Sequence, residues 1–246
     1  MRVSARCLLW RALAMLPLLV LGGCPVRPPP AAVPASAAPV IAANLGAPYD
    51  VSAAESLLTI LVYKGGALAG AGHNHVIASH ELSGNIYLGT DVLQTTFELH
   101  VPVTTLTVDE NELRAGEHSS EFPPDVPDSA KAGTRHNMLG EALLDGERHP
   151  QIVLRALRLR AAQPDVTGTL LAQVQASVRD ELHEFEVPVR YEQAAGTIVV
   201  SGETTLKQSE LGLKPFSAML GALVVQDEMR VRFRIVAHAA RREPAH

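Results

Sequence analysis

Apolar and polar residues alternate along several stretches of this chain, and such alternation predicts half-buried β-strands. The pattern runs through residues 80–89 and 94–103, while 56–63 is largely apolar and rich in residues that favour strands. Near the end of the chain, residues 229–238 predict a strand with one apolar face and one polar face. Their apolar face carries Val231, Phe233, Ile235 and Ala237, and their polar face carries Arg230, Arg232 and Arg234.

Two further stretches, 166–179 and 183–191, predict a long hairpin because the short polar segment 180–182 joins them. One face of the second stretch would carry Phe185, Val187, Val189 and Tyr191. The alternation within 151–160 is imperfect. It would place Ile152, Leu154, Ala156 and Arg158 opposite Val153, Arg155, Leu157 and Leu159. With 197–208, the chain then has about eight antiparallel strands, a number that closes a barrel around side chains or one small ligand.

The alternation of apolar and polar residues is interrupted in two places between these strands, and both interruptions predict a short inserted helix. Residues 109–118 are polar, with Leu113 as the one large aliphatic residue. Residues 128–145 begin with Asp128 as the expected N-cap. One face of this second helix would carry Met138, Leu139, Ala142 and Leu143. The predicted fold class is therefore mainly β, an antiparallel barrel with two short helices.

The N-terminus has the composition of an export signal. A positively charged start with Arg2 and Arg6 precedes the mostly apolar run 8–21, which is shorter than the about 20 residues that span a bilayer. The run ends in Leu-Gly-Gly-Cys, which resembles the lipobox of bacterial lipoproteins. We therefore expect residues 1–23 to be a removable signal peptide and Cys24 to carry a lipid. The alternative is an ordinary signal peptide that a cysteine happens to follow.

This interpretation places the protein at the periplasmic face of a bacterial membrane. No Asp follows Cys24, which favours the outer membrane. Residues 24–48 are a mixture of Pro and Ala, so they are expected to form a semi-extended linker to a single folded domain, 49–240. Because the other cysteine, Cys7, lies in the signal peptide, the mature protein has no disulfide available. A net charge of −5 gives no basic stripe and argues against a nucleic-acid partner.

Four short motifs, in their order along the chain, resemble the YceI-like family of periplasmic proteins. They are Gly-His-Asn-His-Val at 72–76, residues 144–152 with Asp-Gly-Glu-Arg-His-Pro, residues 207–212 with Lys-Gln-Ser-Glu-Leu-Gly, and residues 221–228. No single motif is specific to the family, but the four motifs occurring in this order over residues 50–238 are. The resemblance implies an extended, lipocalin-like barrel that binds a long amphiphilic molecule such as a polyisoprenoid.

The chain departs from the family pattern at two loops. Residues 178–183 replace the His-Gly-Val-Thr-Lys-Pro of many members at the hairpin turn, and the loop 116–125 contains Pro123-Pro124. These differences bear on the identity of the ligand more than on the fold. The interior of the barrel is either filled by side chains or hollow. An aromatic content of only 4% favours a cavity, and a filled barrel used as an interaction scaffold is the alternative.

The histidines allow a rival function. His73, His75 and His80 lie close in sequence, and neutral imidazoles bind zinc and copper, so a metal- or haem-linked redox accessory protein is the alternative to a lipid carrier. No acidic or sulfur partner lies near them in sequence. We therefore favour structural or lumen-lining roles, with no metal and no cofactor other than a bound lipid. Acidic residues such as Asp109 are most simply interpreted as solvated charges at helix ends.

The expected ligand-binding residues come from two places. Residues 215–223 form an apolar loop before the last strand, with Phe216, Met219, Leu220 and Leu223 placed to gate or plug the barrel mouth. His73, His75 and Arg135 are candidates to hydrogen-bond an anionic headgroup. The mature chain has no free cysteine, and no Gly-x-Ser-x-Gly elbow, so we expect binding without catalysis. Neither the particular lipid nor the oligomeric state follows from the sequence.

Overall fold

The computed structural model describes residues 46–162 and 168–240. The predicted signal peptide, the predicted lipid attachment at Cys24 and almost all of the predicted linker lie outside the described residues. The first strand, β1 (Ala47–Val51), begins two residues before the predicted start of the folded domain at 49. Pro48 and Tyr49 already pair with neighbouring strands, so the folded domain starts slightly earlier than its composition indicates.

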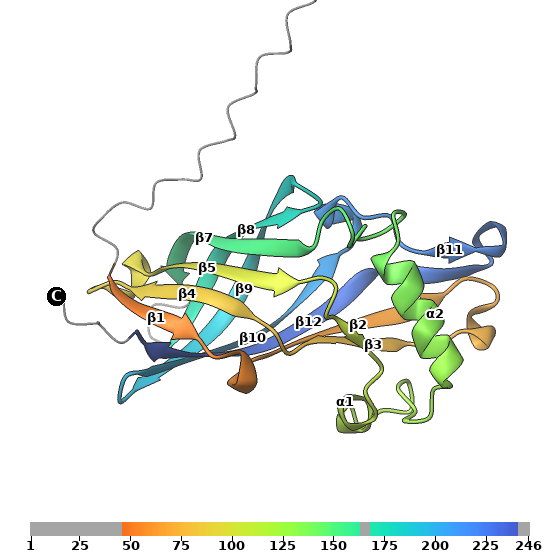
Figure 1. Ribbon diagram of the computed structural model, residues 1–246, viewed down its shortest axis with the longest axis horizontal. Helices are drawn as coiled ribbons and strands as arrows, with labels where there is room; N and C mark the ends of the chain where they lie inside the picture. The colour runs from red at the N-terminus through yellow and green to blue at the C-terminus, as the bar shows by residue number, and fades with distance from the viewer. Residues whose placement is uncertain (1–45, 163–167, 241–246) are drawn as a thin grey trace, which may run out of the picture. The chain divides into compact units, whose positions relative to one another are not determined.

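Eight antiparallel strands form a closed ring, which confirms the predicted barrel (Figure 1). Each strand pairs with the next in the ring, and the pair β1–β12, with Tyr49 opposite Ala239, closes it. In ring order the strands are β1, β4 (Ser83–Leu88), β5 (Thr96–Pro102), β7 (Gln151–Ala161), β8 (Thr169–Val178), β9 (Glu181–Ala194), β10 (Thr197–Lys207) and β12 (Leu223–Ala239).

A second set of strands extends the wall at one end of the barrel. Strand β12 is 17 residues long, and one of its edges pairs first with β2 (Leu57–Gly65) and then with β1. Strand β2 pairs with β3 (His75–Ser79), which in turn pairs with the two-residue β6 (Thr107–Val108). The short β11 (Ser217–Ala218) pairs with the start of β12. This end of the barrel therefore carries all the histidines of the 72–76 motif.

The two predicted helices are present, and both are shorter than predicted. They are α1 (Asn111–Gly116) and α2 (Asp128–Leu139), and neither is long and apolar enough to cross a membrane. Five single 3-10 turns accompany them: η1 (Ala53–Glu55), η2 (Ala69–Ala71), η3 (Val92–Gln94), η4 (Ser209–Leu211) and η5 (Met219–Gly221).

Helix α2 ends at Leu139 because Gly140 leaves the helical conformation, with φ −70° and ψ 164°. The expected helical positions of Ala142 and Leu143 are therefore wrong. Both lie in the following turn, where the N–H of Leu144 donates to the carbonyl of Met138 at 3.1 Å. The expected N-cap is also wrong, since Pro127 occupies that position and Asp128 is the first helical residue. The Asp128 carboxylate still lies in the first turn, where it complements the helix dipole.

The imperfect alternation in β7 has a structural cause. A β-bulge between Ala156 and Arg158 inserts Leu157 as an extra residue, which lies 45% exposed. Beyond the bulge the inward face continues at Leu159, which is buried against Leu154 and β8. The regular alternation predicted for 151–160 is therefore wrong after Ala156, because one inserted residue moves every later side chain to the other face.

The predicted hairpin is β8–β9, with a turn tighter than predicted. Only Arg179 and Asp180 connect the strands, with φ of 51° and 63°, and Glu181 already pairs with Val178. Two successive positive φ values match the right-handed twist of the strands they join. As predicted, Phe185, Val187 and Val189 share the face of β9 that points into the barrel.

Candidate functional site

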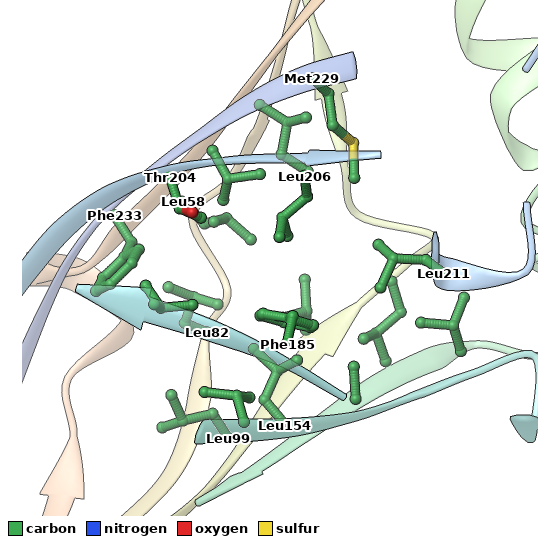
Figure 2. Close-up of a pocket in the computed structure, with 18 of the residues that line it drawn as sticks. Leu58, Leu82, Leu99, Leu154, Phe185, Thr204, Leu206, Leu211, Met229 and Phe233 are labelled. Carbon is green, nitrogen blue, oxygen red and sulfur yellow. The ribbon is translucent and has the colours of Figure 1, made fainter. Parts of the chain in front are cut away.

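The interior of the barrel contains a cavity of about 240 Å³ with an almost entirely apolar wall. Among the described residues that line it, only Thr204 and Gln208 have polar side chains. Figure 2 shows side chains such as Leu99, Leu154 and Phe185 converging on the space from different strands. We call this space the lumen. The low aromatic content thus corresponds to a hollow barrel, because small residues such as Ala172 and Ala176 occupy wall positions.

A second cavity of about 210 Å³ adjoins the lumen at the end that holds β3 and α2. We call it the vestibule. Its wall contains polar side chains as well as apolar ones, among them Lys64, His73, His75, Thr134 and Asn137. The two cavities share the wall residues Val62, Ile77, Met138, Leu143 and Gln208. The two cavities therefore adjoin, one with an apolar wall and the other with a partly polar wall.

The polar end is organised around His75, whose side chain is fixed by a buried carboxylate. The Nδ1 atom of His75 lies 2.6 Å from Oδ2 of Asp109, and its Nε2 atom lies 3.3 Å from Oγ1 of Thr134. Because an ionised carboxylate can only accept, Nδ1 carries the proton of this hydrogen bond. In the neutral ring, Nε2 is then a hydrogen-bond acceptor on the vestibule side.

Asp109 is completely buried and lies at the centre of a charged network. Its Oδ1 atom accepts hydrogen bonds from the Val76 N–H at 2.9 Å and from Nη1 of Arg114 at 2.5 Å. Burial on its own raises the pKa of the Asp109 carboxyl, but the hydrogen bonds from His75, Val76 and Arg114 outweigh it and hold the pKa below its usual range. The earlier interpretation of Asp109 as a solvated helix-end charge is therefore wrong.

Arg114, also with no exposed surface, ties the network to the loop that differs from the family pattern. It donates to the carbonyl of Asn74 at 2.7 Å and to the carbonyl of Pro123 at 2.8 Å. Its guanidinium lies 5.7 Å from the ring centroid of Phe122, which is buried edge-on against Tyr63. The loop 116–125 thus packs behind the histidines and holds them in place.

Lys64 and His73 complete the polar wall of the vestibule. The Nζ atom of Lys64 donates to the carbonyl of Gly72 at 3.0 Å, and the Lys64 N–H donates to Oδ1 of Asn74 at 2.9 Å. The rings of His73 and His75 are tilted, with centroids 6.2 Å apart. Lys64 is thus held beside the two histidines at one wall of the vestibule.

The histidines do not assemble a metal site in the part of the chain that the structure describes. There, no three His, Cys, Asp or Glu side chains lie close enough together to hold a metal ion. His80 points away to Glu110, with its Nε2 atom 2.9 Å from Oε1. The acidic partner missing from the sequence around His75 is Asp109, which is also hydrogen-bonded to Arg114.

The predicted ligand-binding residues divide into two groups. His73, His75, Phe216 and Leu223 all line the vestibule, so the structure brings both predicted segments together. Three others lie elsewhere: Arg135, Met219 and Leu220 line neither cavity. Arg135 donates to the carbonyls of Leu106 and Thr104 instead of facing a headgroup. Met219 and Leu220 point into solvent.

The sequence analysis missed Lys64, Asp109, Arg114, Thr134 and Asn137 as parts of this end of the barrel. Asp109 and Arg114 lie in a polar stretch that is indistinguishable from a solvated helix. Their only local signal is the apolar pair Leu106 and Val108 just before them, which marks the end of a strand. Lys64 directly follows the predicted strand 56–63.

Comparison with known proteins agrees with this architecture. A model of the YceI-like domain family matches residues 51–237, which is most of the chain. The chain belongs to the YceI-like family. No match was found among the curated proteins.

Among solved structures, BcnA from Burkholderia cenocepacia superposes with a TM-score of 0.54 at 14% sequence identity. The match covers 76% of this chain and 98% of BcnA. A polyisoprenoid-binding domain from Saccharophagus degradans gives a TM-score of 0.48 at 12% identity, covering 78% of this chain and 98% of that domain. The YceI protein of Campylobacter jejuni gives 0.44 at 6% identity, covering 65% and 82%. At these identities the likeness to BcnA concerns the fold alone.

Proposed function

We propose that this protein binds one long amphiphilic lipid of polyisoprenoid type, with the chain in the lumen and the polar end in the vestibule. The observation that carries the proposal is the shared wall between an apolar cavity and a polar one. Neither cavity alone reaches the roughly 300 Å³ of an ordinary ligand pocket, whereas the two together do. A ligand that occupies both cavities would be long and amphiphilic.

The chemistry of the lumen selects hydrocarbon. A polar ligand there would exchange its hydrogen bonds to water for a wall in which only Thr204 and Gln208 are polar. Leaving even one amide or hydroxyl unpaired in such surroundings costs about 1–3 kcal/mol. Gln208 is already engaged, since its Nε2 donates to the carbonyl of Gln226 at 2.8 Å. A branched isoprenoid chain needs no polar partner.

The polar end of the lipid would lie against His75, His73 and Lys64. Asp109 orients the imidazole of His75, so that its Nε2 atom faces the vestibule with a fixed role. The ammonium group of Lys64 has three N–H donors, and only one of them is used in the hydrogen bond to the carbonyl of Gly72. A hydroxyl, phenol or phosphate end would find a partner here. Arg135, first proposed for this role, is replaced by Lys64.

We further propose that the protein acts without catalysis and stays tethered to a membrane by the lipid on Cys24. The tether would lie at the periplasmic face, with the outer membrane favoured, and residues 25–46 would set the reach of the barrel. These parts of the proposal rest on the composition of the N-terminus and on the lack of a nucleophile motif in the sequence.

The lumen is tested with a pair of substitutions on one strand. Ala176 is buried and faces the lumen from β8, so Ala176→Phe fills part of the cavity. Gln173 is exposed on the opposite face, so Gln173→Phe adds the same side chain outside. The purified proteins are examined by native mass spectrometry, followed by organic extraction and metal analysis of the same samples.

A bound isoprenoid lipid near one per chain in the wild type and in Gln173→Phe, but not in Ala176→Phe, supports the proposal. Overpacking costs about 1–3 kcal/mol, so the folded state of Ala176→Phe is checked by circular dichroism. A protein that is empty even after incubation with polyisoprenol would contradict the proposal and favour a scaffold. Stoichiometric metal without lipid would favour a redox accessory role.

A further inference from the structure

Two loops at the vestibule end expose large apolar side chains to solvent. Seven such side chains are exposed in the part of the chain that the structure describes, and four of them lie here. They are Leu68, Phe216, Met219 and Leu220, which we call the apolar rim. Met219 is 70% exposed and Leu220 is fully exposed, so neither contributes to the core. A cluster of this kind, unlike single exposed leucines, marks an interaction surface.

The two loops form one structural unit. The N–H of Leu68 donates to the carbonyl of Ala222 at 2.7 Å, and Gly65 pairs with Val224 where β2 meets β12. Figure 1 shows η2, after β2, and η5, after β11, at the same end of the barrel. A side chain at position 66 would collide with the carbonyl of Ala222 at 2.4 Å, so the close approach depends on Gly66. The rim is therefore held together by backbone contacts.

The backbone of η5 presents its side chains outward in an unusual conformation. Met219 and Leu220 have φ of 51° and 55°, and Gly221 follows at 88°. Residues other than glycine rarely adopt this left-handed region, and such outliers cluster at functional sites. Two exposed apolar side chains therefore lie on a backbone conformation that is unfavourable for residues other than glycine.

The rim carries no charge. Neither segment 65–72 nor segment 215–225 contains Asp, Glu, Lys or Arg, although 19% of the chain is charged. A protein partner is normally recognised through a polar, hydrogen-bonding border around an apolar centre. Two uncharged segments with exposed apolar side chains suit the interfacial region of a bilayer, where side chains such as Leu and Phe are buried at the boundary between headgroups and acyl chains.

The inner side of the same loops lines the vestibule. Phe216, Leu223 and Gly72 all belong to its wall, so the rim and the polar end of the site are two faces of one structure. We propose that the apolar rim inserts into the surface of a lipid bilayer, so that the ligand passes between membrane and vestibule without crossing water. The route rests on the proposed function, whereas the insertion rests on the rim residues themselves.

Insertion is tested with a fluorophore at the rim. The mature chain, starting at residue 24 and carrying Cys24→Ser, has no other cysteine, because Cys7 lies in the signal peptide. An environment-sensitive nitrobenzoxadiazole label is attached to Leu220→Cys or, as a control, to Leu157→Cys on β7, which is 45% exposed. We expect phosphatidylcholine vesicles to shift the emission at 220 to the blue, with quenching by nitroxides on the acyl chains, and to leave 157 unchanged.

A paired substitution measures how much the rim contributes. Met219→Asp with Leu220→Asp should weaken binding to phosphatidylcholine vesicles by at least about tenfold, because burying one such side chain already has an effect of this size. Leu157→Asp, the matched control, should leave binding unchanged. Adding phosphatidylglycerol to the vesicles should change little, since the rim has no charge. Both variants alter only exposed side chains, so folding is retained.

Two outcomes would overturn the proposal. One is a label at 220 that does not respond to vesicles or responds no more than the label at 157. The other is a blue shift of the label at 220 that appears without vesicles as the protein concentration rises. This result would show that a second copy of the chain, and not a bilayer, covers the apolar rim. The variant Ala176→Phe distinguishes this proposal from the proposed lipid site, because it should lose the lipid in the lumen but keep the response to vesicles. The rim variant should keep lipid supplied in detergent but take it up slowly from vesicles.

Discussion

At the scale of single residues, the pair Asp109 and Arg114 is the least expected feature of the barrel. Both side chains are fully buried. Asp109 is bonded by Arg114, His75 and the Val76 N–H, and Arg114 donates to two backbone carbonyls, whereas its Nη2 atom has no partner among the described residues. Burying such a pair is expensive, and removing one member leaves an uncompensated charge. We infer that the pair is retained because it orients His75 toward the vestibule.

Replacing Asp109 should therefore destabilise the protein strongly. We expect Asp109→Asn to lower the free energy of unfolding by about 3–5 kcal/mol, because Arg114 would remain buried and charged. Chemical denaturation measures the difference. The control is Glu186→Gln, which breaks the half-exposed pair with Arg160 and should cost less than about 1 kcal/mol. Equal losses for both variants would show that the buried network contributes nothing special.

The same carboxyl makes stability depend on pH in a defined window. The folded-state pKa of Asp109 is lower than its unfolded value of about 3.9, so its contribution is complete above that pH. It is lost as the pH falls through the folded-state pKa. We expect the free energy of unfolding of the wild type to fall below about pH 4, and the fall to be shallower in Asp109→Asn. Parallel curves for the two proteins would refute this assignment.

The roles of Asp109 and Arg114 could not be predicted from the sequence. His73 and His75 were identified from a local motif, whereas Asp109 is 34 residues away from His75 and reaches it only through the β3–β6 pairing. Arg135 was predicted to face a headgroup and Lys64 was not, although both are cations within or next to predicted elements. Which of them faces a cavity depends on tertiary packing, and no local pattern encodes that.

At the scale of elements, strand β10 passes unusually close to its neighbours at Gly202. A Cβ at this position would lie 2.5 Å from the carbonyl oxygen of Pro188 and 2.6 Å from Cζ of Phe233. Phe233 in turn lies opposite Gly202 on β12 and lines the lumen. Because Gly202 has no side chain, the ring of Phe233 can pack directly against the backbone of β10.

We expect Gly202→Ala to lower the free energy of unfolding by about 1–3 kcal/mol, since the backbone of β9 cannot easily move away. The matched control is Gly133→Ala in α2, where a Cβ meets nothing within 4 Å. That change should stabilise the protein by about 0.5–1 kcal/mol, because alanine suits a helix better than glycine. Thermal unfolding distinguishes the two signs, and a neutral Gly202→Ala would contradict the close packing.

Most elements could be predicted from the sequence because their patterns are local. The hairpin β8–β9 and the second part of β12 follow directly from period-two alternation, whereas β12 begins at Leu223, six residues before the predicted strand at 229. The bulge at Leu157 could not be predicted, because it is defined by the register against β8. The end of α2 was also missed, since Met138 to Leu143 continues to look helical although Gly140 stops it. Strands β1 and β6 are too short to show a period.

At the scale of the whole molecule, the proposed tether makes a clear prediction. In cells, the wild type should fractionate with membranes, and Cys24→Ser should not be lipidated and should lose that association after export. Mass spectrometry of the N-terminal peptide identifies the acyl groups on Cys24 in the wild type. A wild-type protein that is processed elsewhere and recovered unacylated would refute the tether while leaving the barrel and its site untouched.

The position of β12 in the ring has a consequence for how the chain acquires its fold. This strand begins at Leu223 yet pairs with β1, β2 and β10, and Ser56 hydrogen-bonds to Val236 across 180 residues. Contacts of such long sequence separation form slowly, because most of the chain has to be ordered first. Until β12 arrives, β10 and β2 remain open edges. The barrel therefore cannot close before β12, the last strand along the chain, has been made.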